Sequence, residues 1–343
     1  METKIPLAAL FPEEIETSLQ IKPAFRARQI FLWVSKGVES FEAMKNLDKE
    51  TRKILEEKAL LRTSRVSKVL KDPDGTIKLQ ITLHDGRAIE TVLLTDREGR
   101  KTACVSCQAG CAMGCAFCQT GTLGLGRNLT ASEIVEEFLF MEKEAGTLDN
   151  IVFMGMGEPM QNLDAIRKAV AILTSKNGRA LSPRRITLST CGIIKGIYDL
   201  ANNGPKMRLA ISLTTADEEL RCQLMPVTKG NPLPELKKAV AYYIEKTGQR
   251  VTLEAALLSG KNTGTESAGN MIEFARGLDV YINLIPWNPV SGLEFKTPGR
   301  EECRTFVSQL ERAGLNVNLR LPRGQKIGGA CGQLGKATVA QNW

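Results

Sequence analysis

The sequence predicts an α/β protein built on a partial parallel barrel, preceded by a smaller accessory domain. After residue 130, strand-like apolar runs alternate with amphipathic helical runs, which is typical of a parallel sheet with outer helices. No glycine-rich dinucleotide fingerprint follows the first strand, and this disfavours a doubly wound sheet. Cysteine, Gly-Glu, serine and asparagine residues fall at expected strand ends, where barrels place their active sites. A partial barrel is therefore favoured.

The accessory domain is expected over residues 1–95, and the catalytic core over 96–343. Apolar residues at helical spacing predict helices within 22–38 and 47–61. The period then changes to that of short strands. Three strands are expected at 64–71, 76–84 and 87–95, with turn sequences "DPDG" and "DG" between them.

The core is expected to repeat strand and helix. Its first helix opens with a capping box, Thr130 to Glu133, and ends at Gly146. A short helix is expected to end near Gly204. The other helices are expected within 162–178, 232–248, 265–278 and 299–315. The strands are expected within 150–159, 184–193, 207–215, 250–260, 280–289 and 317–321.

Composition restricts the protein class. The 343 residues carry a net charge of +8, and no apolar run is long enough to span a membrane. The first residues do not resemble a signal peptide, so we expect a cytoplasmic protein without structural disulfides. The positive charge is compatible with a nucleic-acid partner, although the basic residues are dispersed along the chain.

Five of the nine cysteines lie in "CVSCQAGCAMGCAFC", residues 104–118, here called the cysteine loop. A zinc site that recruits Cys104 or Cys107 is one interpretation. The other follows from C-x3-C-x2-C with Phe117 before the last cysteine, which resembles the signature of radical S-adenosylmethionine (SAM) enzymes. That resemblance implies that Cys111, Cys115 and Cys118 hold a [4Fe–4S] cluster whose fourth iron binds SAM.

The stretch "MGMGEP", residues 154–159, follows the next expected strand. It resembles the Gly-Glu-Pro motif of the same superfamily. The resemblance implies that Gly157 lets the backbone approach the methionine part of SAM. It also implies that Glu158 accepts a hydrogen bond from the amino group of SAM.

Nearly the whole chain resembles the RlmN/Cfr family of RNA adenosine methyltransferases. The matching stretches are "ETVLL", the cysteine loop, "GLGRNLT", "MGMGEPMQN", "SPRRITLST", "ELRCQLMPV", "IPWNP" and "ACGQL". The resemblance implies a partial (βα)6-type TIM barrel of the radical SAM kind. It implies methylation of adenine in 23S ribosomal RNA, at C2 for the RlmN type or C8 for the Cfr type. Transfer RNA is a candidate second substrate, and an electron donor such as flavodoxin or ferredoxin is expected.

The same resemblance implies residue roles. Cys331 matches the thiol that becomes S-methylcysteine, and Cys104 matches the resolving thiol that forms a transient disulfide with it. Glu90 of "ETVLL" matches the proposed proton acceptor. The positions that match SAM contacts are Ser189, Ser212, Leu213, Thr214 and Asn288.

Three departures from the family pattern bear on the target. The chain has Cys107 where serine is usual, "SLTT" where Ser-Leu-His is common, and "RGQKIGG" with Lys326 and Gly328 in place of acidic residues. We expect C2 methylation of ribosomal adenosine. C8 methylation, another radical SAM modification of RNA, and a non-catalytic zinc-containing RNA-binding protein are the alternatives.

Overall fold

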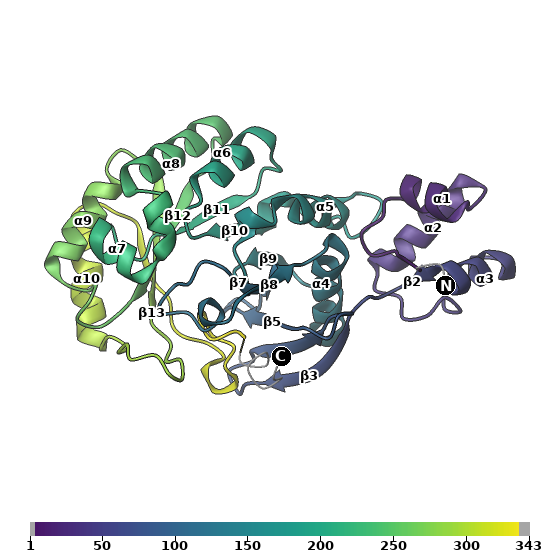
Figure 1. Cartoon of the computed structure of the whole chain (residues 1–343), viewed down its shortest axis with the longest axis horizontal. Coiled ribbons are helices and arrows are strands. Elements are labelled where there is room, and N and C mark those ends of the chain that lie inside the picture. Colours follow the sequence, from purple (N-terminus) through teal and green to yellow (C-terminus); the bar gives the residue numbers. More distant parts are fainter. Residues whose placement is uncertain (1–3, 336–343) are drawn as a thin grey trace.

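A computed structural model describes residues 4–335 of the chain (Figure 1). Its centre is a ten-stranded sheet in the order β14-β13-β12-β11-β10-β9-β6-β5-β4-β3. The seven strands from β6 to β14 follow one another in chain order and are all parallel. Because the order never reverses and the end strands do not pair, the sheet is an incomplete barrel rather than a doubly wound sheet. The predicted α/β fold class is confirmed.

The parallel strands and their helices form six strand–helix units. The strands are β6 (Lys101–Cys104), β9 (Asn150–Phe153), β10 (Ile186–Thr190), β11 (Arg208–Ser212), β12 (Val251–Leu257), β13 (Val280–Pro286) and β14 (Val317–Leu319). The main helices are α4 (Ala131–Ala145), α5 (Leu163–Thr174), α6 (Ile194–Asn203), α8 (Leu233–Thr247), α9 (Thr265–Ala275) and α10 (Arg300–Arg312). Figure 1 shows these helices on the outside of the sheet. The predicted capping box of Thr130 and Glu133 starts α4.

Three antiparallel strands extend the sheet beyond β6. They are β3 (Arg65–Lys71), β4 (Ile77–Thr82) and β5 (Ala88–Thr95), and β5 pairs directly with β6. The three strands thus agree in place with the sequence expectation, and they share one sheet with the core. The domain boundary after residue 95 stays a prediction.

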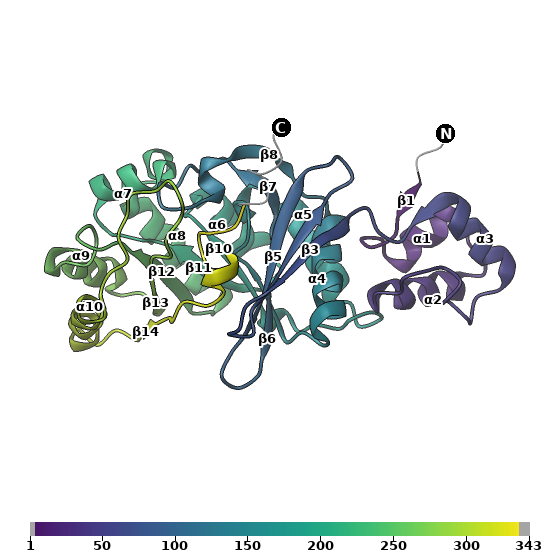
Figure 2. The same ribbon diagram turned by 90° about the horizontal axis from the view of Figure 1, so that it is seen from below.

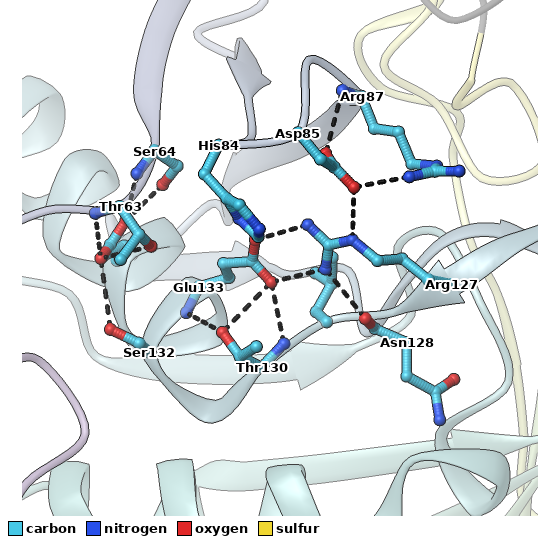
Figure 3. Close-up of polar contacts among 12 residues, drawn as sticks. Thr63, Ser64, His84, Asp85, Arg87, Arg127, Asn128, Thr130, Ser132 and Glu133 are labelled. Atoms are coloured by element: carbon cyan, nitrogen blue, oxygen red, sulfur yellow. Dashed lines mark hydrogen bonds and ion pairs between the residues drawn. The ribbon is translucent and has the colours of Figure 1, made fainter. Parts of the chain in front are cut away.

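The N-terminal helices form a separate lobe at one end of the molecule (Figure 1). This lobe contains β1 (Ile5–Pro6), α1 (Pro12–Leu19), α2 (Ala24–Ser35), α3 (Lys49–Lys58) and β2 (Ala59–Leu60). Its linker to β3 is held by Glu136 of α4, which accepts hydrogen bonds from the backbone N–H groups and hydroxyls of Thr63 and Ser64. The adjacent Glu133 pairs with Arg127 and His84 (Figure 3). Helix α4 therefore joins the lobe to the core.

Several elements were not expected from the sequence. They include β1, α1, β2 and β6, and two further elements near the site. The hairpin of β7 (Gln108–Cys111) and β8 (Gly124–Asn128) encloses the second half of the cysteine loop. The short helix α7 (Glu218–Leu224) lies between β11 and α8 and is capped by Asp217. Among residues 4–335, none of the helices is both long and apolar enough to span a bilayer.

Candidate functional site

A cavity of about 200 Å³ opens at the carboxyl ends of the parallel strands. It is the place where a barrel is expected to carry its active site. Ten of the thirteen site residues predicted from the sequence line it: Cys111, Cys115, Cys118, Gly157, Glu158, Ser189, Ser212, Thr214, Asn288 and Cys331. Cys104, Glu90 and Leu213 do not line the cavity.

The cysteine loop forms one side of the cavity. Two hydrogen bonds anchor it: the Ala116 N–H donates to the Leu224 carbonyl over 2.9 Å, and the Trp287 indole donates to the Phe117 carbonyl over 2.9 Å. Burial raises the pKa of the Cys111 thiol to about 12 and also raises that of Cys115. Such thiols stay protonated when nothing stabilises the thiolate, and they lose the proton when they bind a metal.

The three cavity thiols fit an iron–sulfur cluster. Within residues 4–335, no three side chains of the metal-ligating kind gather closely enough to hold a single ion. A multi-iron cluster needs no such convergence, since each thiolate binds a different iron. The observed spread of Cys111, Cys115 and Cys118 around one cavity suits that donor set better than the zinc interpretation.

Glu158 follows β9 and is almost fully buried. One carboxylate oxygen accepts from the Thr190 hydroxyl over 2.6 Å and from the Met160 N–H, and the other accepts from the Cys191 N–H over 2.8 Å. Burial raises the pKa of the carboxyl, although these hydrogen bonds act in the opposite direction. Glu158 therefore stands in a defined orientation at the cavity wall.

Gly157 has a steric reason to be glycine. Its φ is +108°, and a Cβ there would lie 2.6 Å from the Cβ of Gln108. The backbone at Gly157 therefore closely approaches β7, the strand that ends at the predicted cluster ligand Cys111. A larger residue would push the two segments apart.

Strands β10, β11 and β12 supply further polar groups to the cavity. The Ser189 hydroxyl lies 3.3 Å from that of Ser212 and donates to the Glu254 carboxylate over 3.3 Å. Burial raises the pKa of Glu254, while Arg320 acts to lower it. These hydroxyls and this carboxylate are suited to bind a ligand's hydroxyl or amino groups.

Leu213 contributes through its backbone rather than its buried side chain. Its carbonyl accepts from the guanidinium of Arg221 over 3.0 Å. Arg221 is fully buried and also donates to the carbonyls of Cys191 and Ser212 and to the Thr228 hydroxyl. One side chain thereby holds the ends of β10 and β11 together.

The segment 323–335, here called the Cys331 segment, contributes Cys331 and Gly332 to the cavity lining. Figure 2 shows this part of the chain, in yellow, running from β14 towards β5. The Asn288 amide donates to the Cys331 carbonyl over 3.0 Å, and Gly332 accepts from the N–H of Gln119 in the cysteine loop. Cys331 is an exposed residue that lines the cavity. Its enclosure by protein raises its pKa, as does Glu254, whereas Arg320 acts to lower it.

Cys104 lies at the end of β6 and is 7% exposed. Burial raises the pKa of its thiol, and negative charge on Cys331 raises it further. The two thiols are therefore close enough for their charges to interact, and both are free. A transient disulfide between them requires the two sulfur atoms to come within bonding distance.

Glu90, which matches the proposed proton acceptor, is buried at the edge of the site. Its side chain is 0% exposed, and it forms an ion pair of 3.1 Å with Lys78. Its second carboxylate oxygen accepts from the Gly335 N–H over 2.8 Å. Both oxygens are thus engaged beneath the Cys331 segment.

The sequence departures also have structural positions. Cys107 is buried, and its N–H donates to the Met156 carbonyl over 2.8 Å. Thr214 of "SLTT" lines the cavity with φ +61°. Lys326 and Gly328 are tied through their backbones, the first to Asp72 and the second to Lys78.

Sequence reasoning missed four residues that shape the site: Glu254, Arg320, Arg221 and Lys78. A signal existed for two of them. Glu254 and Lys78 each interrupt an apolar strand, "VTLEAALL" and "TIKLQIT", and a charge at a buried strand position needs a partner or a function.

The comparisons with known proteins agree with this geometry. The family model of the radical SAM superfamily matches residues 105–269, and that of the ribosomal RNA large subunit methyltransferase N-terminal domain matches residues 15–61. A Treponema denticola protein named "Probable dual-specificity RNA methyltransferase RlmN" is 58% identical over 99% of this chain and 98% of its own. A Moorella thermoacetica protein of the same name is 45% identical over 97% and 98%.

One solved structure is similar throughout. It is described as a radical SAM methyltransferase from Sphaerobacter thermophilus, with a TM-score of 0.92 and 40% identity, covering 96% of this chain and 99% of that one.

Proposed function

This chain belongs to the RlmN family of the radical SAM superfamily, and from this premise we propose that it methylates adenine in RNA. The observation that carries the proposal is the pair of free thiols, Cys104 and Cys331, beside a cavity that three further cysteines line. A ring carbon of adenine is a poor nucleophile toward SAM. A protein thiol that carries the methyl group first overcomes this difficulty.

The family uses a [4Fe–4S] cluster and SAM, and we assign their binding to this cavity. Cys111, Cys115 and Cys118 would ligate the cluster. Glu158, Ser189, Ser212 and Thr214 would bind SAM with Asn288, and the backbone at Gly157 and Leu213 would complete the site. When bound, the cluster and SAM supply the methyl group and the one-electron chemistry that removes a hydrogen atom from it.

Cys331 acts as the methyl carrier in this proposal. Its thiol loses a proton and its sulfur takes the methyl group, giving S-methylcysteine. Arg320 favours the charged thiolate, against the effects of enclosure and of Glu254. After hydrogen removal, the carrier's methylene carbon bonds to the adenine ring. The adduct must then lose one electron, which the iron–sulfur cluster would take up, and Glu90 accepts the proton from that ring carbon.

Cys104 releases the product. Its thiol loses a proton, a sulfur–sulfur bond forms between Cys104 and Cys331, and the bond from the Cys331 sulfur to the methylene carbon breaks. The electron pair of that bond goes to the methylene carbon, which takes up a proton and becomes the methyl group. The disulfide must then be reduced before the next cycle, in keeping with a transient catalytic disulfide.

The target proposed is C2 of an adenosine in 23S ribosomal RNA, with transfer RNA as a second substrate. The match of residues 15–61 to a ribosomal RNA methyltransferase domain supports the first target, and the word "dual-specificity" in the names of the relatives supports more than one RNA target. We also propose a cytoplasmic location and a flavodoxin or ferredoxin as electron donor.

Intact mass after incubation with SAM alone tests the proposal. Anaerobically reconstituted protein should gain one methyl group, and Cys331→Ala should gain none. No gain in either protein, with about four irons per chain present, would contradict the carrier mechanism. Digestion of methylated RNA then separates 2-methyladenosine from 8-methyladenosine by chromatography, and the 8-methyl product would overturn the C2 assignment.

A further inference from the structure

Lys78 is a buried cation at the edge of the site, and the mechanism proposed above does not use it. It lies on β4 with 2% of its side chain exposed. Its ammonium nitrogen is 3.1 Å from a carboxylate oxygen of Glu90 and donates to the Gly328 carbonyl over 3.1 Å. A buried ammonium group needs such compensation, since desolvation otherwise outweighs any gain from burial.

The ion pair holds the Cys331 segment on both sides of its thiol. Gly328 stands three residues before Cys331 and is bound by Lys78. Gly335 stands four residues after Cys331, and its N–H is bound by Glu90. A single pair of opposite charges therefore contacts both ends of the short stretch that carries the thiol. Neutral hydrogen bonds from Asn288, Gln119 and Thr120 hold the stretch between those ends, at Cys331, Gly332 and Leu334.

Other contacts add to the same attachment without replacing it. Asp74 accepts from the Gly324 N–H over 2.7 Å, and Asp72 accepts from the Lys326 N–H over 3.2 Å. The two residues held in this way, Gly324 and Lys326, lie before Gly328, at the beginning of the Cys331 segment. Among the residues described, Lys78 and Glu90 are the charged side chains of β4 and β5 that contact the stretch from Gly328 to Gly335.

We propose that Lys78 is a positioning residue for methyl transfer to RNA: its ammonium group joins the Glu90 carboxylate to the stretch that carries Cys331, and so holds the proton acceptor and the methyl carrier in a fixed relation. This inference rests on the proposed function. It assigns Lys78 to the RNA step, where Glu90 and Cys331 act together. Loading of Cys331 from SAM does not use Glu90 and should be far less sensitive.

The test compares Lys78→Met with wild type in the reconstituted holoenzyme. Amide exchange in peptides covering 324–335 should become about tenfold faster, with exchange in β9 to β13 changed less than about twofold. Methyl loading of Cys331 from SAM alone should stay within about threefold. The kcat for RNA methylation should fall by about tenfold or more, while the KM for RNA changes little.

Lys68→Met is the matched control, because Lys68 is exposed on the neighbouring strand β3. It should leave all four measurements unchanged. Unchanged exchange in 324–335 of Lys78→Met would overturn the proposal, as would a parallel loss of Cys331 loading and RNA methylation.

Lys78→Met leaves the Glu90 charge unpaired and could loosen the whole sheet. The double variant Lys78→Met/Glu90→Gln has no unpaired charge. Its amide exchange alone therefore distinguishes loss of the Lys78 attachment from a general loosening of the sheet. Faster exchange confined to 324–335 supports the role of Lys78, and wild-type exchange there overturns it. If wild type itself loads Cys331 but methylates no RNA, the proposed function fails while the exchange comparison still tests the attachment.

Discussion

The cysteine loop and the Cys331 segment line the same cavity but are held by different interactions. The loop is fixed by pairing of β7 with β8 and by neutral hydrogen bonds to Leu224 and Trp287. The Cys331 segment also receives neutral hydrogen bonds, for example from Gln119 and Asn288. Unlike the loop, it is in addition held by charged side chains of β4, β5 and the turn before β4, namely Asp72, Asp74, Lys78 and Glu90.

This difference matches the chemistry proposed for each part. Cluster ligands keep one geometry throughout a reaction, and neutral backbone pairs in a packed core provide that rigidity. Cys331 has three successive partners in the proposed cycle, namely SAM, adenine and Cys104. Attachment by a few charged groups can be released and remade at a lower cost than a packed core can be reorganised.

The largest effect is expected on the rigid side of the cavity, where Arg221 holds the ends of β10 and β11. Arg221→Met would leave the carbonyls of Cys191, Ser212 and Leu213 without their donor, and should lower the free energy of unfolding by about 3–5 kcal/mol. Urea unfolding of the cluster-free protein and the iron content after reconstitution measure it. Arg208→Met, an exposed change at the start of β11, is the control. Equal stability of the two variants would contradict the role given to Arg221.

The second prediction separates chemistry from attachment. Glu90→Gln removes the proton acceptor but keeps an oxygen that can accept from the Gly335 N–H. RNA methylation should fall by about 100-fold or more, whereas Cys331 should still gain a methyl group from SAM. Single-turnover assays with labelled SAM measure both steps. Exposed Glu98→Gln is the control, and RNA methylation at the wild-type rate in Glu90→Gln would exclude Glu90 as the acceptor.

A smaller effect is expected at the beginning of the Cys331 segment. Burial raises the pKa of the Asp74 carboxyl, but hydrogen bonds from Gly324 and Thr76 outweigh it and bring the pKa below its ordinary 3.8. The attachment of Gly324 to Asp74 is therefore complete above pH 3.8 and is lost as the pH falls through the lowered pKa. At neutral pH, Asp74→Asn should speed amide exchange at 324–326 by about fivefold, as expected for losing roughly 1 kcal/mol. Exchange unchanged at pH 7 would argue against this tie.

The smallest effect is expected at Cys107. Its thiol is buried but does not line the cavity, so Cys107→Ser should change the free energy of unfolding by no more than about 1–2 kcal/mol and leave cluster content and Cys331 loading unchanged. Iron analysis and intact mass check this. A lost cluster would show that Cys107 takes part in the cysteine loop's chemistry.

Elements with strong periodicity were predictable from the sequence. The amphipathic helices α4, α8 and α10 and the strands between them lie where apolar spacing and caps indicate. The hairpin β7–β8 was not predictable, because its glycines and cysteines carry no alternating pattern. Helix α7 has only seven residues, too few for a periodic signal.

The candidate site was predictable where local motifs carry it. Cys111, Cys115, Cys118 and Glu158 were named from short stretches and line the cavity. The surroundings of Glu90 were not predictable, since Gly335 is 245 residues away along the chain. Only folding brings the Cys331 segment onto β5, and a motif contains no information on such a contact.

Helix α4 has a consequence for which sequence changes the protein can tolerate. Its Glu133 binds Arg127 of β8. Its Glu136 binds the linker at Thr63 and Ser64, and its Glu137 accepts from the Ser106 N–H in the cysteine loop. Inserting one residue into a helix turns everything after it by about 100°. A single insertion after Glu133 would therefore uncouple the N-terminal lobe and the cysteine loop from β8 at once.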